Sequence, residues 1–273
     1  MLNQTDRTVI RSLAAQVAEI AALPIQEEKR RLWRKLNALQ PVRPMVMIDQ
    51  VCWHEMNVND ELTLRCEDAE CREYEQFLRR TLFQWNHFPV DMVVEDFVRV
   101  PMAIYNSGFG VESQEEIRIS DPVSDVMSHR YINQFKTWDD LEKLHTPQVH
   151  HNPTETERRL AVAHELFDGL LEVRPWGYDP YLSLWDPIAT WMGVENALFA
   201  LVDQPEMMHA LVGRMTDGYL SMLDQLEEQG LLCGPQSLIH CTGAFTDELP
   251  KLGYDPARPR AQDMWMFGLA QMF

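Results

Sequence analysis

The chain has 273 residues, of which 45% are hydrophobic, and its formal net charge is −18 at pH 7. A chain of this length can bury one large core or two small ones, and its acidic balance argues against nucleic acid as a partner, because binding to phosphates needs clustered Lys and Arg. Five scattered cysteines without a CxxC pair, no apolar run near the ~20 residues of a membrane span, and no signal-peptide pattern predict a cytoplasmic protein with reduced thiols and no membrane partner.

Residues 1–40 are predicted to form an N-terminal helical extension. Apolar residues recur with a 3.6-residue period from Val9 to Ile20, and the break at Pro24 separates two short helices. The basic run from Lys29 to Lys35 is interleaved with apolar residues at helical spacing. We therefore interpret these charges as a solvated helix face.

Several short apolar runs in the rest of the chain are typical of strands. The first, Pro44 to Val51, ends in acidic Asp49 and a polar loop, as buried parallel strands do. Further strand candidates are residues 61–65, 93–105, 170–173 and 237–241. Helical patterns near residues 74–85 and 154–168 separate them, and no GxGxxG motif follows the first strand. This alternation predicts a (β/α)8 TIM barrel over residues 41–273. Because a complete barrel takes ~250 residues, we expect this one to be incomplete at its C-terminal side, as in an N-terminal fragment.

The segment from Trp185 to Gly230 has the clearest helical pattern. Asp186 and Pro187 are a helix start, and Asp203 with Glu206 has the spacing of a capping box. Apolar stripes follow both starts, and Gly230 stands where a left-handed C-cap is expected. The pattern predicts two long amphipathic helices, with Glu195 on the apolar stripe of the first.

The same segment carries a resemblance. The sequence W-D-P at 185–187, G-V-E-N at 193–196 and D-x-P-E at 203–206 is similar to the middle of the uroporphyrinogen decarboxylase-like superfamily, and a weaker similarity extends from about Leu13 to the last residue. That superfamily contains the haem-pathway decarboxylase and many cobalamin-dependent methyltransferases. The resemblance implies a TIM barrel of uroporphyrinogen decarboxylase type.

The first apolar run distinguishes the two branches. PVRPMVMID at Pro41 to Asp49 resembles the methyltransferase-like branch, whereas the decarboxylase has an arginine-rich M-R-Q-A-G-R segment after this strand. Residues 48–55 of this chain contain no arginine, although a porphyrinogen with many carboxylates needs converging arginines. The resemblance therefore implies methyl transfer between a small methylated substrate or thiol and a corrinoid, methylcobalamin, supplied by a corrinoid protein. The alternatives are a uroporphyrinogen-type decarboxylase and an inactive barrel that binds a corrinoid or a partner. An incomplete barrel would also pair with itself, which makes a homodimer possible.

In the methyltransferase branch, a His-x-Cys pair and a distant Cys bind zinc, which activates a thiol. The nearest match is His240 and Cys241, which are adjacent and would point to opposite faces of a strand. One of them could bind a metal, and a packed thiol beside a hydrogen-bonded histidine is the alternative. We expect no complete zinc site in this chain and place the ligands beyond residue 273.

The predicted catalytic residues lie where the first barrel strand would open into a loop. His54 and Glu55 could exchange protons near neutral pH, and Asp49 could contact substrate or metal. An exposed loop pair is the alternative for His54 and Glu55, and a helix cap is the alternative for Asp49. The predicted substrate or cofactor pocket, which would take a corrin ring or an aromatic methyl ether, contains Trp185, Asp247, Glu248, Trp265 and Gln271. The alternatives are a plain loop start for Asp247 and Glu248 and half of an unfinished core for Trp265 and Gln271.

Overall fold

A computed structural model describes residues 2–88, 90–119, 127–240 and 242–269. Within these ranges the strands are short and pair only two at a time. Two pairs are parallel, β1 (Phe97–Pro101) with β6 (Glu172–Trp176) and β7 (Tyr181–Ser183) with β10 (Phe267–Leu269). Three pairs are antiparallel, β2 (Ile104–Asn106) with β5 (Val149–His151), β3 (Glu115–Arg118) with β4 (Ser128–Tyr131) and β8 (Leu238–Ile239) with β9 (Thr242–Gly243). The predicted (β/α)8 barrel is therefore wrong, since no sheet among the described residues closes or exceeds two strands.

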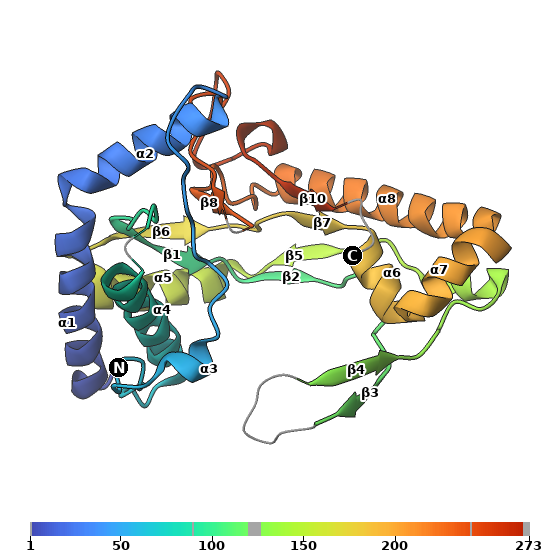
Figure 1. Cartoon of the computed structure of the whole chain (residues 1–273), viewed down its shortest axis with the longest axis horizontal. Helices are drawn as coiled ribbons and strands as arrows, with labels where there is room; N and C mark the ends of the chain where they lie inside the picture. Colours follow the sequence, from blue (N-terminus) through green and yellow to red (C-terminus); the bar gives the residue numbers. More distant parts are fainter. Residues whose placement is uncertain (1, 89, 120–126, 241, 270–273) are drawn as a thin grey trace.

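The chain begins with helices, continues with short strands, one helix and two more strands, and then has a run of three helices before the last short strands (Figure 1). The α-helices are α1 Gln4–Ala21, α2 Pro24–Asn37, α3 Trp53–Met56, α4 Ala69–His87, α5 Pro153–Phe167, α6 Trp185–Met192, α7 Val194–Asp203 and α8 Pro205–Glu228. The strands are β1 Phe97–Pro101, β2 Ile104–Asn106, β3 Glu115–Arg118, β4 Ser128–Tyr131, β5 Val149–His151, β6 Glu172–Trp176, β7 Tyr181–Ser183, β8 Leu238–Ile239, β9 Thr242–Gly243 and β10 Phe267–Leu269. Two short 3-10 helices, η1 Trp138–Lys143 and η2 Ala261–Asp263, complete the set.

The run from Pro44 to Val51 is an extended connection and not a strand. It leads from α2 to α3 (Figure 1), and Val46 is 48% exposed. Side chains satisfy its backbone: the amide of Val46 donates to Asp91 Oδ2 at 2.9 Å, and Gln84 Nε2 donates to the carbonyl of Ile48 at 2.9 Å. The apolar run misled the prediction because a hydrophobic sequence does not by itself supply a neighbouring strand.

One hydrophobic core lies where α1, α4 and α5 surround the β1–β6 pair (Figure 1). Helix α1 contributes Ile10, Ala14 and Val17 to this core, and β1 contributes Val98 and Val100. The two N-terminal helices and the break near Pro24 are confirmed. Because α1 packs directly on α4 and α5, it belongs to the same core as residues far along the chain.

A second core joins α6, α7 and α8. Helix α8 ends as predicted, with Gly230 at a φ of 68° just beyond it. The preceding segment differs from the prediction of one helix, since Gly193 adopts a φ of 77° and divides it into α6 and α7. Glycine tolerates that backbone conformation, whereas other residues are strained there. The kink also leaves Glu195 exposed rather than on the buried stripe.

No single helix among the described residues is long and apolar enough to cross a membrane. Helices α1 and α2 pass that test only as a pair, with a bend of 62° between them.

A buried carboxylate fixes the loop that precedes α4. Glu75 is fully buried and accepts hydrogen bonds from the amides of Arg65 and Cys66 at 2.8 to 2.9 Å and from Arg79 Nε at 2.7 Å. Burial alone would raise its pKa, but these hydrogen bonds outweigh burial and hold the pKa of Glu75 below its ordinary value. The ionised carboxylate therefore stabilises the folded state.

We expect Glu75→Gln to lower the free energy of unfolding by about 3 kcal/mol, because it breaks a buried ion pair. A carboxylate with a lowered folded-state pKa stabilises the protein above its unfolded pKa of about 4.3, and this contribution is lost as the pH falls through the folded pKa. Urea unfolding from pH 7 to pH 3 should therefore show a steeper acid loss in the wild type than in the variant. Glu73→Gln, on the exposed face of the same helix, is the matched control and should change stability little. Equal stability of the two variants would contradict this role for Glu75.

Candidate functional site

The structure places two of the three predicted catalytic residues side by side. His54 and Glu55 lie in α3, with His54 Nε2 3.4 Å from Glu55 Oε1. His54 lines a cavity of about 360 Å³ together with Trp53, Gln76, Arg79 and Arg80. Asp49 is exposed on the connection before α3 and is not part of that lining. The acid/base role of these residues stays a prediction.

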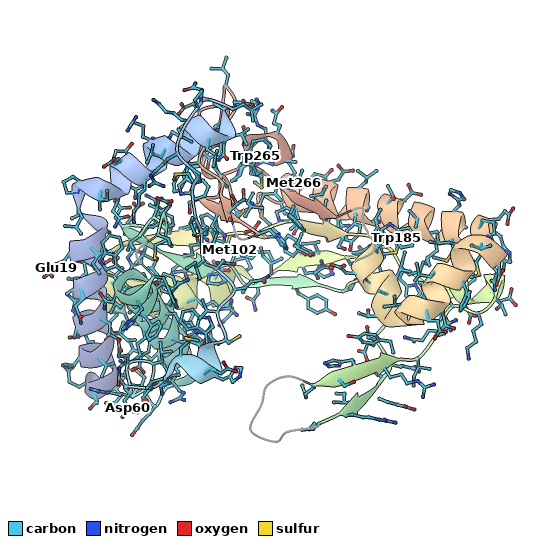
Figure 2. All side chains as sticks on the ribbon, viewed as in Figure 1. Glu19, Asp60, Met102, Trp185, Trp265 and Met266 are labelled. Atoms are coloured by element: carbon cyan, nitrogen blue, oxygen red, sulfur yellow. The ribbon has the colours of Figure 1, made fainter. Side chains whose placement is uncertain are left out.

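The predicted pocket residues fall in two places (Figure 2). Trp185 starts α6 and packs on the α6–α8 core, whereas Trp265 lies in the C-terminal segment near α2. Trp265 and Arg34 line the same cavity, and Asp247 lies near it, because Asp247 Oδ1 is 3.5 Å from Arg34 Nε. Glu248 is exposed, and Gln271 lies outside the described residues. Only Trp265 and Asp247 are therefore brought near one another.

The metal candidates are not assembled into a site among the described residues. His240 is exposed and stacks on Phe267, with ring centroids 4.3 Å apart, and Cys241 lies outside the described residues. Within the described part of the chain, no group of three or more His, Cys, Asp or Glu side chains could hold a metal ion. Zinc binding by this chain stays a prediction.

The best candidate for a binding site is the cavity around Trp265, which we call the arginine cavity. Its volume is about 250 Å³, and its walls come from α2, the start of β1, β6 and the segment 235–249. Its lining combines guanidinium groups, aromatic rings and a buried amide. The lining residues are Arg30, Arg34, Glu95, Phe97, Arg174, Pro235, Gln236, Ser237, Ala244, Phe245, Thr246, Leu249 and Trp265.

Helix α2 forms one wall of the cavity, because one of its faces lines the cavity and another is anchored to the rest of the protein. Arg30 and Arg34 are four residues apart and share the cavity side of the helix. Trp33 is 3% exposed and donates from Nε1 to the carbonyl of Asp91 at 2.8 Å. Asn37 Nδ2 donates to the carbonyls of Gly243 at 2.9 Å and Phe245 at 2.7 Å. These contacts fix the segment 243–245 against the end of the helix.

Residues of the paired strands β1 and β6 form another wall. Phe97 lies opposite Glu172, and Arg99 lies opposite Arg174. The guanidinium carbon of Arg174 lies 3.9 Å from the centroid of the Phe97 ring, and Arg174 Nη2 donates to Glu172 Oε2 at 2.6 Å. That hydrogen bond raises the pKa of Arg174. Arg174 lines the cavity, and a guanidinium with one N–H group paired has further donors for an acid.

Carboxylates balance the arginines of the cavity. Arg30 Nη2 is 3.0 Å from Glu95 Oε2, and Arg34 Nη1 is 2.9 Å from Glu27 Oε1. A guanidinium has five N–H donors, so each of these pairs leaves donors for a further acceptor. The arrangement can thus bind a small anion without carrying a large net charge itself.

One polar atom of the lining lacks a partner. Gln236 is 5% exposed, and its Nε2 donates to Asp179 Oδ1 at 2.7 Å. Its Oε1 is buried without a hydrogen-bond partner in the described structure. A buried unpaired acceptor costs about 1–3 kcal/mol, which a binding site can recover when a ligand or water reaches it.

Sequence reasoning missed the arginines of this cavity. The basic run in α2 was interpreted as a solvated face, yet Lys29 is buried and Arg30 and Arg34 line the cavity. The usable signal was the alternation of charged and apolar residues in FVRVP and EVRPW, which places Arg99 and Arg174 on one face of a strand pair. Which strands pair cannot be seen in the sequence alone.

Comparison with protein-family models, with curated proteins and with solved structures found no match to this chain. The fold and the site define a mixed α/β protein with an arginine-lined, aromatic cavity. Membership in the uroporphyrinogen decarboxylase-like superfamily stays a prediction.

Gly243 provides a test of the cavity wall. A Cβ added there would lie 2.5 Å from Trp33 Cδ2, so we expect Gly243→Ala to cost about 1–3 kcal/mol of stability through overpacking. Gly213→Ala is the matched control, because Gly213 lies inside α8 with nothing within 4 Å of an added Cβ, and it should stabilise the protein by up to about 1 kcal/mol. Thermal unfolding measures both. A neutral Gly243→Ala would show that the wall is looser than described.

Proposed function

We propose that the protein is a methyltransferase-like enzyme, which transfers a methyl group between a small planar acid in the arginine cavity and a corrinoid carried by a partner protein. The observation that supports the substrate class is the guanidinium of Arg174 stacked at 3.9 Å on Phe97, beside Trp265. The flat rings suit an aromatic ring, and the guanidinium suits a carboxylate. The resemblance to the methyltransferase-like branch supports the reaction.

The size of the cavity agrees with a small substrate. Sites for drug-sized ligands have volumes of about 300–1,000 Å³, and the arginine cavity, at about 250 Å³, is slightly smaller. A single aromatic ring fits this volume, whereas a corrin or porphyrinogen ring does not. The corrinoid therefore belongs to a separate carrier in this proposal, and a cytoplasmic location is part of it.

The residues of this chain would bind and orient the substrate. Arg174, with Arg30 and Arg34 opposite, would hold the acid group, and Phe97 with Trp265 would hold the ring. A reduced corrinoid, when bound, would supply the nucleophile for the methyl carbon of an ether. The carbon–oxygen bond would break, and its electron pair would stay on the oxygen of the demethylated product. His54 is not part of the arginine cavity, so we assign it no step there.

A decarboxylase is the second candidate. The sequence argument against it was the missing arginine-rich segment after residue 48. The arginines of the cavity come instead from α2 and β6, and three guanidinium groups around one cavity favour a substrate with more than one carboxylate. Because a porphyrinogen ring does not fit this cavity, the substrate of such a decarboxylase would be a smaller polycarboxylate, and release of carbon dioxide from such an acid would favour this candidate over methyl transfer.

Substrate binding is tested with benzoate and its neutral analogue benzamide, by titration calorimetry. Benzoate should bind at least tenfold more tightly than benzamide, and Arg174→Gln should remove that preference, because charged hydrogen bonds contribute about 1.5–3 kcal/mol. Arg130→Gln, on the exposed strand β4, is the control and should bind like the wild type. Equal binding of benzoate and benzamide would contradict the proposed substrate class.

Methyl transfer is tested by adding 4-methoxybenzoate, reduced cobalamin and zinc to the protein and following the cobalamin absorption spectrum. Formation of methylcobalamin is the expected result. If the spectrum stays unchanged with methyl ethers, methylthiols and methylfolate while benzoate still binds, the cavity is a binding site and the methyl-transfer proposal fails.

A further inference from the structure

A second cavity lies beside the arginine cavity, between α4 and the strand β1. We call it the α4 cavity. Its volume is about 440 Å³, which is within the range of small-molecule sites. It shares Glu95, Phe97 and Ser237 with the arginine cavity and is otherwise separate from it.

The α4 cavity is mostly apolar and elongated. Its lining follows α4 from Glu73 to Gln84, a distance of about 16 Å along a helix, and follows the chain from Met92 to Pro101. Tyr74 and Phe77 come from the helix. Phe77 is 46% exposed and offers its ring to an apolar ligand in this cavity. An unbranched apolar chain matches this shape.

One guanidinium in this lining has no counter-ion. Arg99 Nη2 donates to Ser237 Oγ at 2.9 Å, and the guanidinium carbon lies 4.3 Å from the Trp176 ring centroid. Among the described residues, no carboxylate is within ion-pair distance of Arg99. Buried charges are normally paired, so this half-buried guanidinium, held by one neutral hydrogen bond and by the Trp176 and Phe97 rings, is suited to pair with an anion.

The nearest carboxylates are committed to other groups. Glu95 pairs with Arg30 at 3.0 Å, and Asp179 accepts from Gln236 at 2.7 Å. Both act on Arg99 only through space, and burial, the largest influence, lowers the pKa of Arg99. The remaining acid of the lining, Glu73, is exposed on α4.

We propose that the α4 cavity binds a linear aliphatic carboxylate, whose chain lies between α4 and β1 and whose acid group pairs with Arg99. This occupant satisfies both features at once. Its methylenes cover Phe77 and the apolar wall, and its carboxylate supplies the anion that Arg99 lacks. The site is independent of the methyl-transfer proposal, because Arg99 does not line the arginine cavity.

Decanoate and decanol test the proposal in the wild-type protein by titration calorimetry. Decanoate should bind at least tenfold more tightly than decanol, and each methylene added from hexanoate to decanoate should tighten binding by up to about fourfold. Equal affinities of the acid and the alcohol, or no binding of either, would overturn the proposal.

Arg99→Gln should weaken decanoate binding at least tenfold and leave decanol binding unchanged, which also shows that the variant is folded. Arg80→Gln is the matched control, because Arg80 also stacks on a tryptophan, at 4.9 Å from the Trp53 centroid, and lines a different cavity. It should bind decanoate like the wild type. If Arg99→Gln binds neither ligand, Arg99→Lys is used instead. This variant keeps the positive charge, so it should bind decanoate more tightly than decanol. Loss of decanoate binding in Arg80→Gln to the same extent as in Arg99→Gln would overturn the assignment.

Discussion

The parallel register of β1 and β6 is the constraint on which both cavities depend. It places Val98 and Val100 in the core with α1, α4 and α5. The alternate residues Phe97 and Arg99 then face the other way, together with Arg174 of β6. A shift of one residue in this pairing would exchange the two faces, burying guanidinium groups in the core and exposing valines to the cavity. The pairing therefore decides which side chains join the core and which line the arginine cavity, while residues of both faces, Phe97, Val98 and Arg99, line the α4 cavity.

Most of the long helices of this protein could be predicted from the sequence, although the break at Gly193 and the short helix α3 could not, and neither could the pairing of the strands. Helix α8 carries its own apolar stripe and its own terminal glycine, so local information is sufficient. Strands of two to five residues carry too little pattern to show whether a partner exists. The run from Pro44 to Val51 illustrates the failure: its backbone is satisfied by Asp91 and Gln84, which are distant in sequence and carry no mark of that role. The barrel prediction rested on such runs and was wrong for this reason.

The candidate site shows the same division. Trp265 was predicted as a pocket residue from its aromatic character, and it does line the arginine cavity. The guanidinium groups around it come from α2 and β6, more than 130 residues apart, and only the tertiary structure brings them together. Trp185, chosen by the same reasoning as Trp265, packs instead on the helical core of α6–α8. Residue type indicates what a side chain can do, but the long-range packing decides which side chains meet.

The two cavities share a wall, which is made of Glu95, Phe97 and Ser237. Phe97 carries the guanidinium of Arg174 on its face, and Ser237 accepts the hydrogen bond of Arg99 while also lining the arginine cavity. Arg99 donates one N–H to Ser237 and has further donors, so a carboxylate can pair with it while that hydrogen bond remains. Ser237 accepts this bond and keeps its own hydroxyl proton to donate. The shared wall therefore positions Arg99 for one cavity and Arg174 for the other.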